Sequence, residues 1–382
     1  MRNKFLSTLI VFFTNLLLIQ FSMAQDQFIF DVSEIQILED GNKIIGSKRG
    51  KILTNDGIVI EADNFIYKKI ENILNATGKV TIKDNINNYN ISSDNITYER
   101  NKEKIFSKGK TKSEIDSRFI LESSDVIFLR NEKLLSSNRN STIIDKNEQT
   151  YIELKNLNFF LEDKILKGEK ILVNINFNLP QNDKLFFDSG MFNFNKKSFM
   201  AKDVKINLKK DIFDNLENDP RLKGLSAESE NNITVIKKGV FTSCNDDTDC
   251  PPWVITASEI KHDKNKKQLI YDNALLKIYN VPVLYFPKFF HPDPTVKRQS
   301  GFLKPSVNNS NILGSSLNLP YYHVISHNKD FTFRPTFFDS DIKMFQNEYR
   351  LKNNNSSAIL DFSFVDGYQS SLSNKTNSIS HF

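Results

Sequence analysis

The sequence predicts an all-β protein in which a stack of β-rungs is followed by the first strands of a transmembrane antiparallel β-barrel. Three observations predict this fold class: a 31-residue repeat, a later stretch of alternating aromatic and polar residues, and no long apolar segment after Ala24. Inside lipid only helices and closed barrels satisfy the backbone, so any later membrane span must be β. We expect a signal peptide at 1–24, the stacked rungs at 25–239, a junction at 240–300 and an incomplete barrel at 301–382.

The first 24 residues have the features of a cleaved secretory signal. Arg2 and Lys4 precede the mostly apolar run 5–19, and Ser22-Met23-Ala24 is a small-x-small cleavage site. The apolar run is shorter than the roughly 20 residues that a spanning helix needs. We therefore predict export, and an uncleaved N-terminal helix is the alternative.

The composition bounds both the size and the partners of the protein. A chain of 382 residues is too long for one ordinary core, so two domains or a repeat array are expected. The net charge of +5 arises from 51 basic and 46 acidic residues that are scattered along the whole chain. Without a dense Lys/Arg block, this charge indicates a solvated surface and no nucleic-acid partner.

Residues from Phe28 to about Gly239 contain the repeat. Four similar segments recur at intervals of 31 residues and begin at Asp63, Asp94, Asp125 and Asn156. Residue types that tolerate tight turns stand at matching later positions, namely Gly78, Gly109 and Asn140. Short strand patterns lie before and after, so each unit is expected to form a hairpin-like rung with a tight turn at these positions.

Rungs of this size cannot bury their own apolar faces, and a fixed period of 20–50 residues predicts a stack. The stack is expected to enclose an apolar slot lined by inward residues such as Phe65, Ile96 and Ile127. The slot is either an ordinary core or a groove, open along one edge, that carries lipid chains. The pattern alone does not separate the two interpretations.

The junction at 240–300 holds both cysteines and many of the prolines. In an exported chain, Cys244 and Cys250 are expected to pair. This disulfide would close a loop of about seven residues and stabilise the fold by roughly 2 kcal/mol. Pairing with cysteines of another chain, or beyond residue 382, is the competing possibility. Three acidic residues, Asp246, Asp247 and Asp249, lie between Cys244 and Cys250. They lack the downstream Glu and the Gly spacing of a calcium-binding loop.

The histidines show no metal-ligand spacing, and the chain has no nucleophile elbow, phosphate loop or catalytic Ser/His/Asp set. We therefore predict no catalytic residue, no metal and no cofactor, and a protein that is not an enzyme.

Long amphipathic strands are predicted from Gly314 onward. Phe331, Phe333 and Phe337 alternate with Thr332 and other polar residues, and similar alternation follows in 345–351 and 357–364. Segments of about 9–11 residues between polar turns are typical of transmembrane β-strands. A soluble antiparallel sheet with one solvent-exposed face is the alternative.

Only a few transmembrane strands fit before residue 382, whereas single-chain barrels begin at about eight strands. We therefore expect the remaining strands of the barrel beyond residue 382.

Pro305 and Pro320 stand at the head of these strands. Proline has no N–H to donate to a β-ladder and is confined to sheet edges or bulges. The two prolines therefore predict a weak seam between strands.

Several motifs resemble the family of LPS-assembly proteins (LptD, also called OstA or organic solvent tolerance proteins). The resemblance rests on Phe241-Thr242-Ser243-Cys244, Pro252-Trp253, Val281 to Pro287, Arg298 to Pro305, Leu319 to Tyr322, Asp330-Phe331-Thr332 and Glu348-Tyr349-Arg350, in that order. It extends over the mature chain, because the repeat is similar to the family's periplasmic OstA-type β-jellyroll and 300–382 to its first barrel strands.

The resemblance implies an outer-membrane protein with its N-terminal domain in the periplasm. Such a protein receives lipopolysaccharide from an LptA-like periplasmic bridge protein and inserts it into the outer leaflet, together with an LptE-like lipoprotein inside the barrel. It also implies that Pro305 and Pro320 lie at a lateral gate, and that Cys244 matches a jellyroll cysteine that pairs near the barrel's C-terminus. The alternative function is a soluble periplasmic lipopolysaccharide or lipid carrier of the LptA type.

Overall fold

The computed structural model describes residues 28–178, 183–208, 219–244, 252–293, 296, 298–303, 305–311, 313–369 and 376–381. The chain divides into two compact units, residues 1–162 and 163–382. Strands account for almost all regular structure in the described residues, and the two helical turns are the short 3-10 segments η1 (Glu39–Gly41) and η2 (Arg100–Lys102). The all-β prediction is therefore confirmed.

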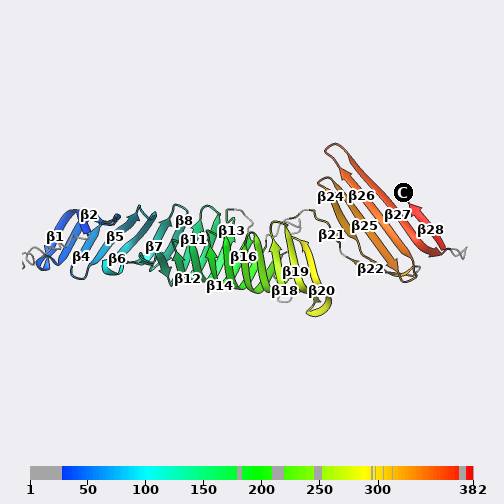
Figure 1. Cartoon of the computed structure of the whole chain (residues 1–382), viewed down its shortest axis with the longest axis horizontal. Helices are drawn as coiled ribbons and strands as arrows, with labels where there is room; N and C mark the ends of the chain where they lie inside the picture. Colours follow the sequence, from blue (N-terminus) through cyan, green and yellow to red (C-terminus); the bar gives the residue numbers. More distant parts are fainter. Residues whose placement is uncertain are drawn as a thin grey trace, which may run out of the picture. The chain divides into compact units, whose positions relative to one another are not determined.

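The first unit is a stack of antiparallel strands that follow one another in sequence order, coloured blue to green in Figure 1. Its strands are β1 (Phe28–Leu38), β2 (Lys43–Thr54), β3 (Ile58–Ala62), β4 (Asn64–Lys68), β5 (Ile73–Asp84), β6 (Tyr89–Glu99), β7 (Lys104–Ile115), β8 (Phe119–Ser124), β9 (Ile127–Leu129), β10 (Leu134–Ser137), β11 (Ser141–Asp145) and β12 (Thr150–Phe160).

The strands of this unit form two facing layers because the long strands bend in the middle. Residues 73–77 of β5 pair with β4, whereas residues 81–84 pair with β3. We call the layer that contains β4, β9 and β10 layer I, and the layer that contains β3, β8 and β11 layer II. The layers contact each other through aromatic rings, such as Phe119 of layer II and Phe159 of layer I at 5.4 Å between centroids.

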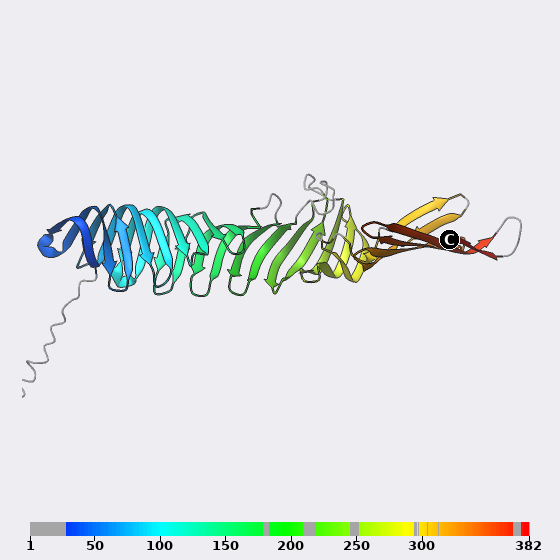
Figure 2. The same cartoon turned by 90° about the horizontal axis from the view of Figure 1, so that it is seen from above.

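Turns connect the strands along two edges, one for each layer (Figure 2). The layer I edge contains the turns that start near residues 69, 100 and 130, and the layer II edge contains those near 55, 85, 116 and 146. Neighbouring turns on an edge are hydrogen-bonded: the Arg130 amide donates to the Glu103 carbonyl at 3.0 Å, and the Asp116 amide to the Asn88 carbonyl at 2.8 Å. Each edge is thus a ladder of turns.

The tight turns predicted at Gly78 and Gly109 were wrong, whereas Asn140 lies in the short connection between β10 and β11. Gly78 and Gly109 lie inside β5 and β7, where positive φ angles of 79° and 83° mark bends in continuous strands. The pairing of β5 with β6 shifts register between Thr77 and Val80, which is the signature of a β-bulge. A Cβ on Gly78 would lie 2.6 Å from Asp63 Oδ2, so both backbone conformation and space require glycine there.

The second unit begins with another run of antiparallel strands, each paired with the next along the chain. They are β13 (Ile165–Ile175), β14 (Asp183–Asn193), β15 (Ser198–Asn207), β16 (Arg221–Glu230), β17 (Ile233–Thr242), β18 (Trp253–Asp263), β19 (Gln268–Ile278) and β20 (Val281–Pro292). The segment that we expected to be a junction, 240–300, therefore contains three further strands of this run.

The same unit also contains a separate eight-stranded antiparallel sheet. Its strands are β21 (Gly301–Phe302), β22 (Ser306–Ser310), β23 (Gly314–Asn318), β24 (Tyr321–Ser326), β25 (Lys329–Phe338), β26 (Lys343–Lys352), β27 (Ser357–Gln369) and β28 (Thr376–His381). Within the described ranges, no helix has the length and apolar character that a membrane crossing requires.

Candidate functional site

The interior between the two layers of the first unit is mostly apolar. Inward side chains alternate along most strands, as in β3, where Ile58, Ile60 and Ala62 are buried. The largest side chains with almost no exposure in this unit are Phe65, Tyr98, Phe119, Phe159, Ile52, Ile58, Ile60, Leu74, Ile82, Ile91 and Ile105. A row of apolar side chains therefore runs along the unit.

The three residues predicted to line this interior do not all point into it. Phe65 and Ile96 are buried, but Ile127 is half-exposed, and its neighbours Val126 and Phe128 are buried instead. The positive φ of 53° at Asp125 inserts a bulge that shifts the alternation by one residue relative to the first two repeats. A one-residue shift turns every side chain of a strand to its other face. The inward orientation predicted for Ile127 was wrong.

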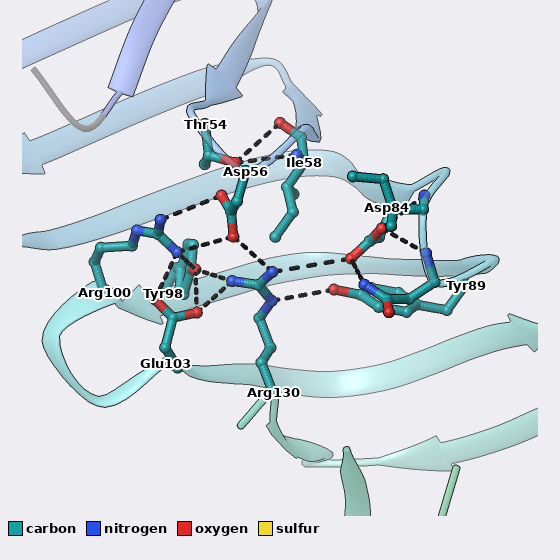
Figure 3. Close-up of polar contacts among 11 residues, drawn as sticks. Thr54, Asp56, Ile58, Asp84, Tyr89, Tyr98, Arg100, Glu103 and Arg130 are labelled. Carbon is teal, nitrogen blue, oxygen red and sulfur yellow. Dashed lines mark hydrogen bonds and ion pairs between the residues drawn. The ribbon is translucent and has the colours of Figure 1, made fainter. Parts of the chain in front are cut away.

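Charged side chains bridge the two edges of this unit around Arg130, which starts a turn on the layer I edge (Figure 3). Its Nη2 lies 2.7 Å from Asp56 Oδ2 and 3.9 Å from Asp84 Oδ2, and both carboxylates lie at the layer II edge. Its Nε donates to the Tyr89 hydroxyl at 3.2 Å, and its Nη1 donates to the carboxylate of Glu103 on its own edge. Arg130 thus contacts both edges at once.

Arg100 makes a second bridge beside the first. Its Nη1 donates to Asp56 Oδ2 at 3.2 Å and to the Tyr98 hydroxyl at 2.6 Å. Its Nη2 lies 3.2 Å from Asp56 Oδ1, and an ion pair joins it to Glu103. We call these seven residues the Arg100–Arg130 cluster: Asp56, Asp84, Tyr89, Tyr98, Arg100, Glu103 and Arg130.

The cluster is an ion-paired network at neutral pH. Burial opposes ionisation of Asp56, but hydrogen bonds from Thr54 and Arg130 and the charges of both arginines lower its pKa to about 2. The pKa of Asp84 is also lowered, because hydrogen bonds from Asn87, Tyr89 and Ile86 outweigh its burial. Burial raises the pKa of Tyr98 to about 12, so the hydroxyl stays protonated. The sequence analysis did not find the cluster; its visible signal is a polar turn at the start of consecutive repeats.

The separate sheet has one apolar and one polar face. Across β25, β26 and β27 the register aligns Phe331 with Tyr349, and Tyr349 with Leu360. On the other face Thr332 aligns with Glu348, and Glu348 with Asp361. The predicted alternation within each strand therefore continues across the strands as two opposite surfaces.

The edge of this sheet is interrupted at the two predicted prolines. Pro305 lies between β21 and β22, and Pro320 lies between β23 and β24. β21 pairs with β24 and β22 pairs with β23, and in the gap the Leu303 amide donates to the Pro320 carbonyl at 2.8 Å. By contrast, β25 and β26 pair without interruption from Lys329 to Phe337. The structure therefore brings the two prolines to one break in the outermost ladder.

An ion network on the polar face ties the start of this edge to the strands behind it. The Asp330 carboxylate accepts hydrogen bonds from Arg298 and, at 2.7 Å, from Arg350 Nε. Arg298 also donates to the Tyr322 hydroxyl at 3.0 Å and to the His327 carbonyl at 2.8 Å. Asp330 is buried between the two guanidinium groups.

The predicted cysteine pair is not tested, because Cys250 and the acidic residues Asp246, Asp247 and Asp249 lie outside the described residues. The Cys244 Sγ lies 3.9 Å from the Trp253 carbonyl oxygen. His262 is buried against Asp293, and burial lowers the pKa of His291, whose Nε2 lies 2.7 Å from the Tyr271 hydroxyl. No group of His, Cys, Asp and Glu in the described ranges has the arrangement of a metal site.

These features define a class of protein: a stacked antiparallel β-jellyroll with an apolar interior, and an amphipathic antiparallel sheet with an interrupted edge. No family model matches the chain. Curated proteins that are similar to it are named LPS-assembly protein LptD. The relative from Yersinia enterocolitica is 34% identical over 126 residues, that from Polaromonas is 37% identical over 98, and that from Pseudomonas aeruginosa is 29% identical over 138.

The similarity covers a limited part of each protein. For the Yersinia enterocolitica relative it extends over 33% of this chain and 16% of the relative, and for the Pseudomonas aeruginosa relative over 36% and 15%. The matched part thus spans less than a fifth of the length of these relatives. The resemblance predicted from the motifs is confirmed at this level of similarity.

Proposed function

We propose that this chain acts in lipopolysaccharide transport at the outer membrane, with its jellyroll in the periplasm. In this role it receives lipopolysaccharide from a periplasmic bridge and passes it to the outer leaflet. The observation that carries the proposal is the similarity to proteins named for LPS assembly. It is a transport role, in which the polypeptide makes and breaks no covalent bond and the energy is supplied elsewhere.

The apolar interior of the jellyroll supports a path for acyl chains. Exposing a chain to water costs about 0.8 kcal/mol per CH₂, so a transported amphiphile needs continuous apolar surroundings while its sugars stay hydrated. The row of inward side chains that includes Phe65 and Ile96 provides such surroundings along the first unit. In this proposal the two layers move apart to admit the chains.

The amphipathic sheet supports a membrane wall with a lateral gate. Its apolar face would meet lipid, and its polar face would meet the lumen of a barrel completed by further strands. Pro305 and Pro320 weaken the ladder at the edge of the sheet, because neither can donate a backbone hydrogen bond. We propose that lipopolysaccharide leaves sideways at this break.

Two protein partners fit the remaining surfaces. In the described residues β1 pairs with β2 alone, and its side chains Ile35 and Ile37 are exposed, which favours addition of a strand from an LptA-like bridge protein. The polar face of the separate sheet would contact an LptE-like lipoprotein inside the barrel. Cys244 would form a disulfide with Cys250 or with a cysteine near the end of the barrel, and mass spectrometry of non-reduced peptides distinguishes the two.

Photocrosslinking tests the proposed path, because the structure supplies inward and outward positions in the same strands. A photoreactive residue at Phe65, Ile96 or Phe128 should label bound lipopolysaccharide. The same residue at Ile66 or Ile127, which point outward or are half-exposed, should label weakly. Equal labelling at Phe65 and Ile66 would contradict an interior path and leave the apolar row as ordinary core.

Membrane partitioning separates this proposal from a soluble carrier of the LptA type. We expect the chain to associate with lipid vesicles through residues 301–369. A cysteine introduced at exposed Leu360 or Phe364 should therefore be protected from thiol-reactive probes in vesicles. A cysteine introduced at exposed Glu71, in a turn of the first unit, is the control and should stay reactive. Full reactivity at all three positions would favour the soluble carrier.

A further inference from the structure

The Arg100–Arg130 cluster closes the side of the first unit that lies opposite the bends. Three of its ion pairs cross from the layer I edge to the layer II edge: Arg100 to Asp56, Arg130 to Asp56 and Arg130 to Asp84. Figure 3 shows the side chains meeting between the turns from which they come. An amphiphile with its chains between the layers and its head group in water must pass this line of contacts.

The three carboxylates of the cluster differ in their hydrogen-bond partners and in their exposure to solvent. Asp84 has its own partners at the layer II edge, since its Oδ1 accepts the amides of Ile86 and Asn87, each at 2.9 Å. Glu103 lies on the same edge as the arginines. Asp56 is the most exposed member, at 36% of its side chain, and most of its contacts are with Arg100 and Arg130.

Within the cluster, the residues of the two edges carry opposite net charge when Asp56 separates from the arginines. The layer I edge then presents Arg100, Arg130 and Glu103, with one positive charge in excess, while Asp56 and Asp84 leave the layer II edge negative. Arg130 is only 12% exposed and Arg100 15%, so an unpaired guanidinium there is poorly hydrated. A new anion is required to compensate the arginines, because an unpaired buried charge is costly.

We propose that Arg100 and Arg130 form a binding site for the phosphate groups of a phosphorylated amphiphile, which displace Asp56 and thereby remove two of the three ion pairs that close the side of the stack. This inference rests on the proposed function, in which acyl chains occupy the interior. A guanidinium group presents several N–H donors in one plane and can donate to two oxygens of the same phosphate group. Two of them side by side, above an apolar interior, match a sugar phosphate attached to acyl chains.

Binding measurements with two lipids test the site. The probes are a bisphosphorylated, acylated diglucosamine and the same lipid after removal of both phosphates, each presented to the full chain in detergent micelles. Arg100→Gln should weaken binding of the phosphorylated lipid by about tenfold, as expected for loss of a charge-assisted hydrogen bond. Asp56→Asn should strengthen it about threefold, because the competing carboxylate is gone. Neither change should alter binding of the dephosphorylated lipid.

Arg118→Gln is the matched control. Arg118 pairs with Asp145 at 2.6 Å, but both residues lie on the layer II edge, so this ion pair does not cross the opening. It should leave binding of both lipids unchanged. If Arg118→Gln acts like Arg100→Gln, or if Arg100→Gln weakens both lipids equally, the arginines serve only to hold the stack together and the proposal fails. Weaker binding of the phosphorylated lipid by Asp56→Asn would also overturn it.

The same experiment separates failure of this site from failure of the proposed function. A wild-type chain that binds both lipids equally overturns the phosphate site and leaves lipid transport standing. A chain that binds neither lipid overturns both. Inorganic phosphate is titrated alone as well: we expect it to bind much more weakly than the phosphorylated lipid, and equal binding would make the site one for free anions. Circular dichroism confirms that each variant is folded.

Discussion

The first unit and the β21–β28 sheet place their apolar and charged side chains in opposite ways. The first unit buries its apolar row between two layers and sets ion pairs across the opening of the stack. The separate sheet exposes apolar side chains on one face and gathers its ion network, Arg298 with Asp330 and Arg350, on the other. The same period-two pattern thus supports a closed interior in one region and an exposed apolar surface in the other.

Truncating a phenylalanine in each region should give the largest contrast. Phe119→Ala removes a side chain with 0% exposure, which packs on Phe159, and should lower the free energy of unfolding of the first unit by about 3–5 kcal/mol. Phe364→Ala changes a side chain that is 41% exposed and should cost less than about 0.5 kcal/mol in detergent. Denaturant titration measures both, and equal costs would contradict the contrast.

Removing the acid between two arginines should have the next largest effect. Asp330→Asn leaves Arg298 and Arg350 without their shared carboxylate and should destabilise the separate sheet by about 1–3 kcal/mol, a range reduced because both arginines are partly exposed. Hydrogen exchange of the β25 and β26 amides reports the change. Asp361→Asn, a change of an exposed acid on β27, is the control and should change exchange little. Similar effects of both variants would contradict a specific role for Asp330.

Restoring a backbone donor at the interrupted edge should have a smaller, local effect. Pro320→Ala supplies an N–H where β23 and β24 are separated, and one added hydrogen bond of about 1 kcal/mol should slow exchange of the Leu303 amide about fivefold. Asn309→Ala, an exposed change on the same edge, should leave that amide unaffected. Unchanged protection in Pro320→Ala would mean that the break does not depend on the proline.

The smallest effect concerns acid stability of the first unit. The pKa of Asp56 is about 2 in the folded state against an ordinary 3.8, so the folded state binds this proton more weakly than the unfolded state. The resulting stabilisation is present above about pH 4 and is lost as the pH falls towards 2. Asp56 is partly exposed, so we expect no more than about 1 kcal/mol. Unfolding curves between pH 2 and 5 should be flatter for Asp56→Asn, and identical curves would contradict the expectation.

The sequence predicted the features that depend on local pattern. The 31-residue repeat and the alternation of residues 331–337 led to strands, and the prolines led to a sheet edge. The same repeat misplaced Ile127, because the bulge at Asp125 is a backbone change that an aspartate in three successive repeats does not reveal. It also misread Gly78 as a turn, since glycine permits both a turn and a bulge.

The Arg100–Arg130 cluster had no comparable signal. Arg130 and Asp56 are 74 residues apart, and they meet only because the strands bend and the two layers face each other. Surface charges are common in any sequence, so their pairing becomes visible only with the topology. The same holds for the ion network of the separate sheet. Arg298 and Asp330 are visible in the sequence as single charged residues, but their contact could not be predicted from it.

The ladders of turns have a consequence for how such a protein can change its reach. A turn on either edge is hydrogen-bonded to its neighbours, so one 31-residue repeat can be added or removed while the cross-section of the remaining repeats is kept. Each repeat contributes two strand widths, or about 10 Å along the stack. The distance that the protein spans can therefore be adjusted in steps of about a nanometre, by duplication or loss of a short stretch of gene.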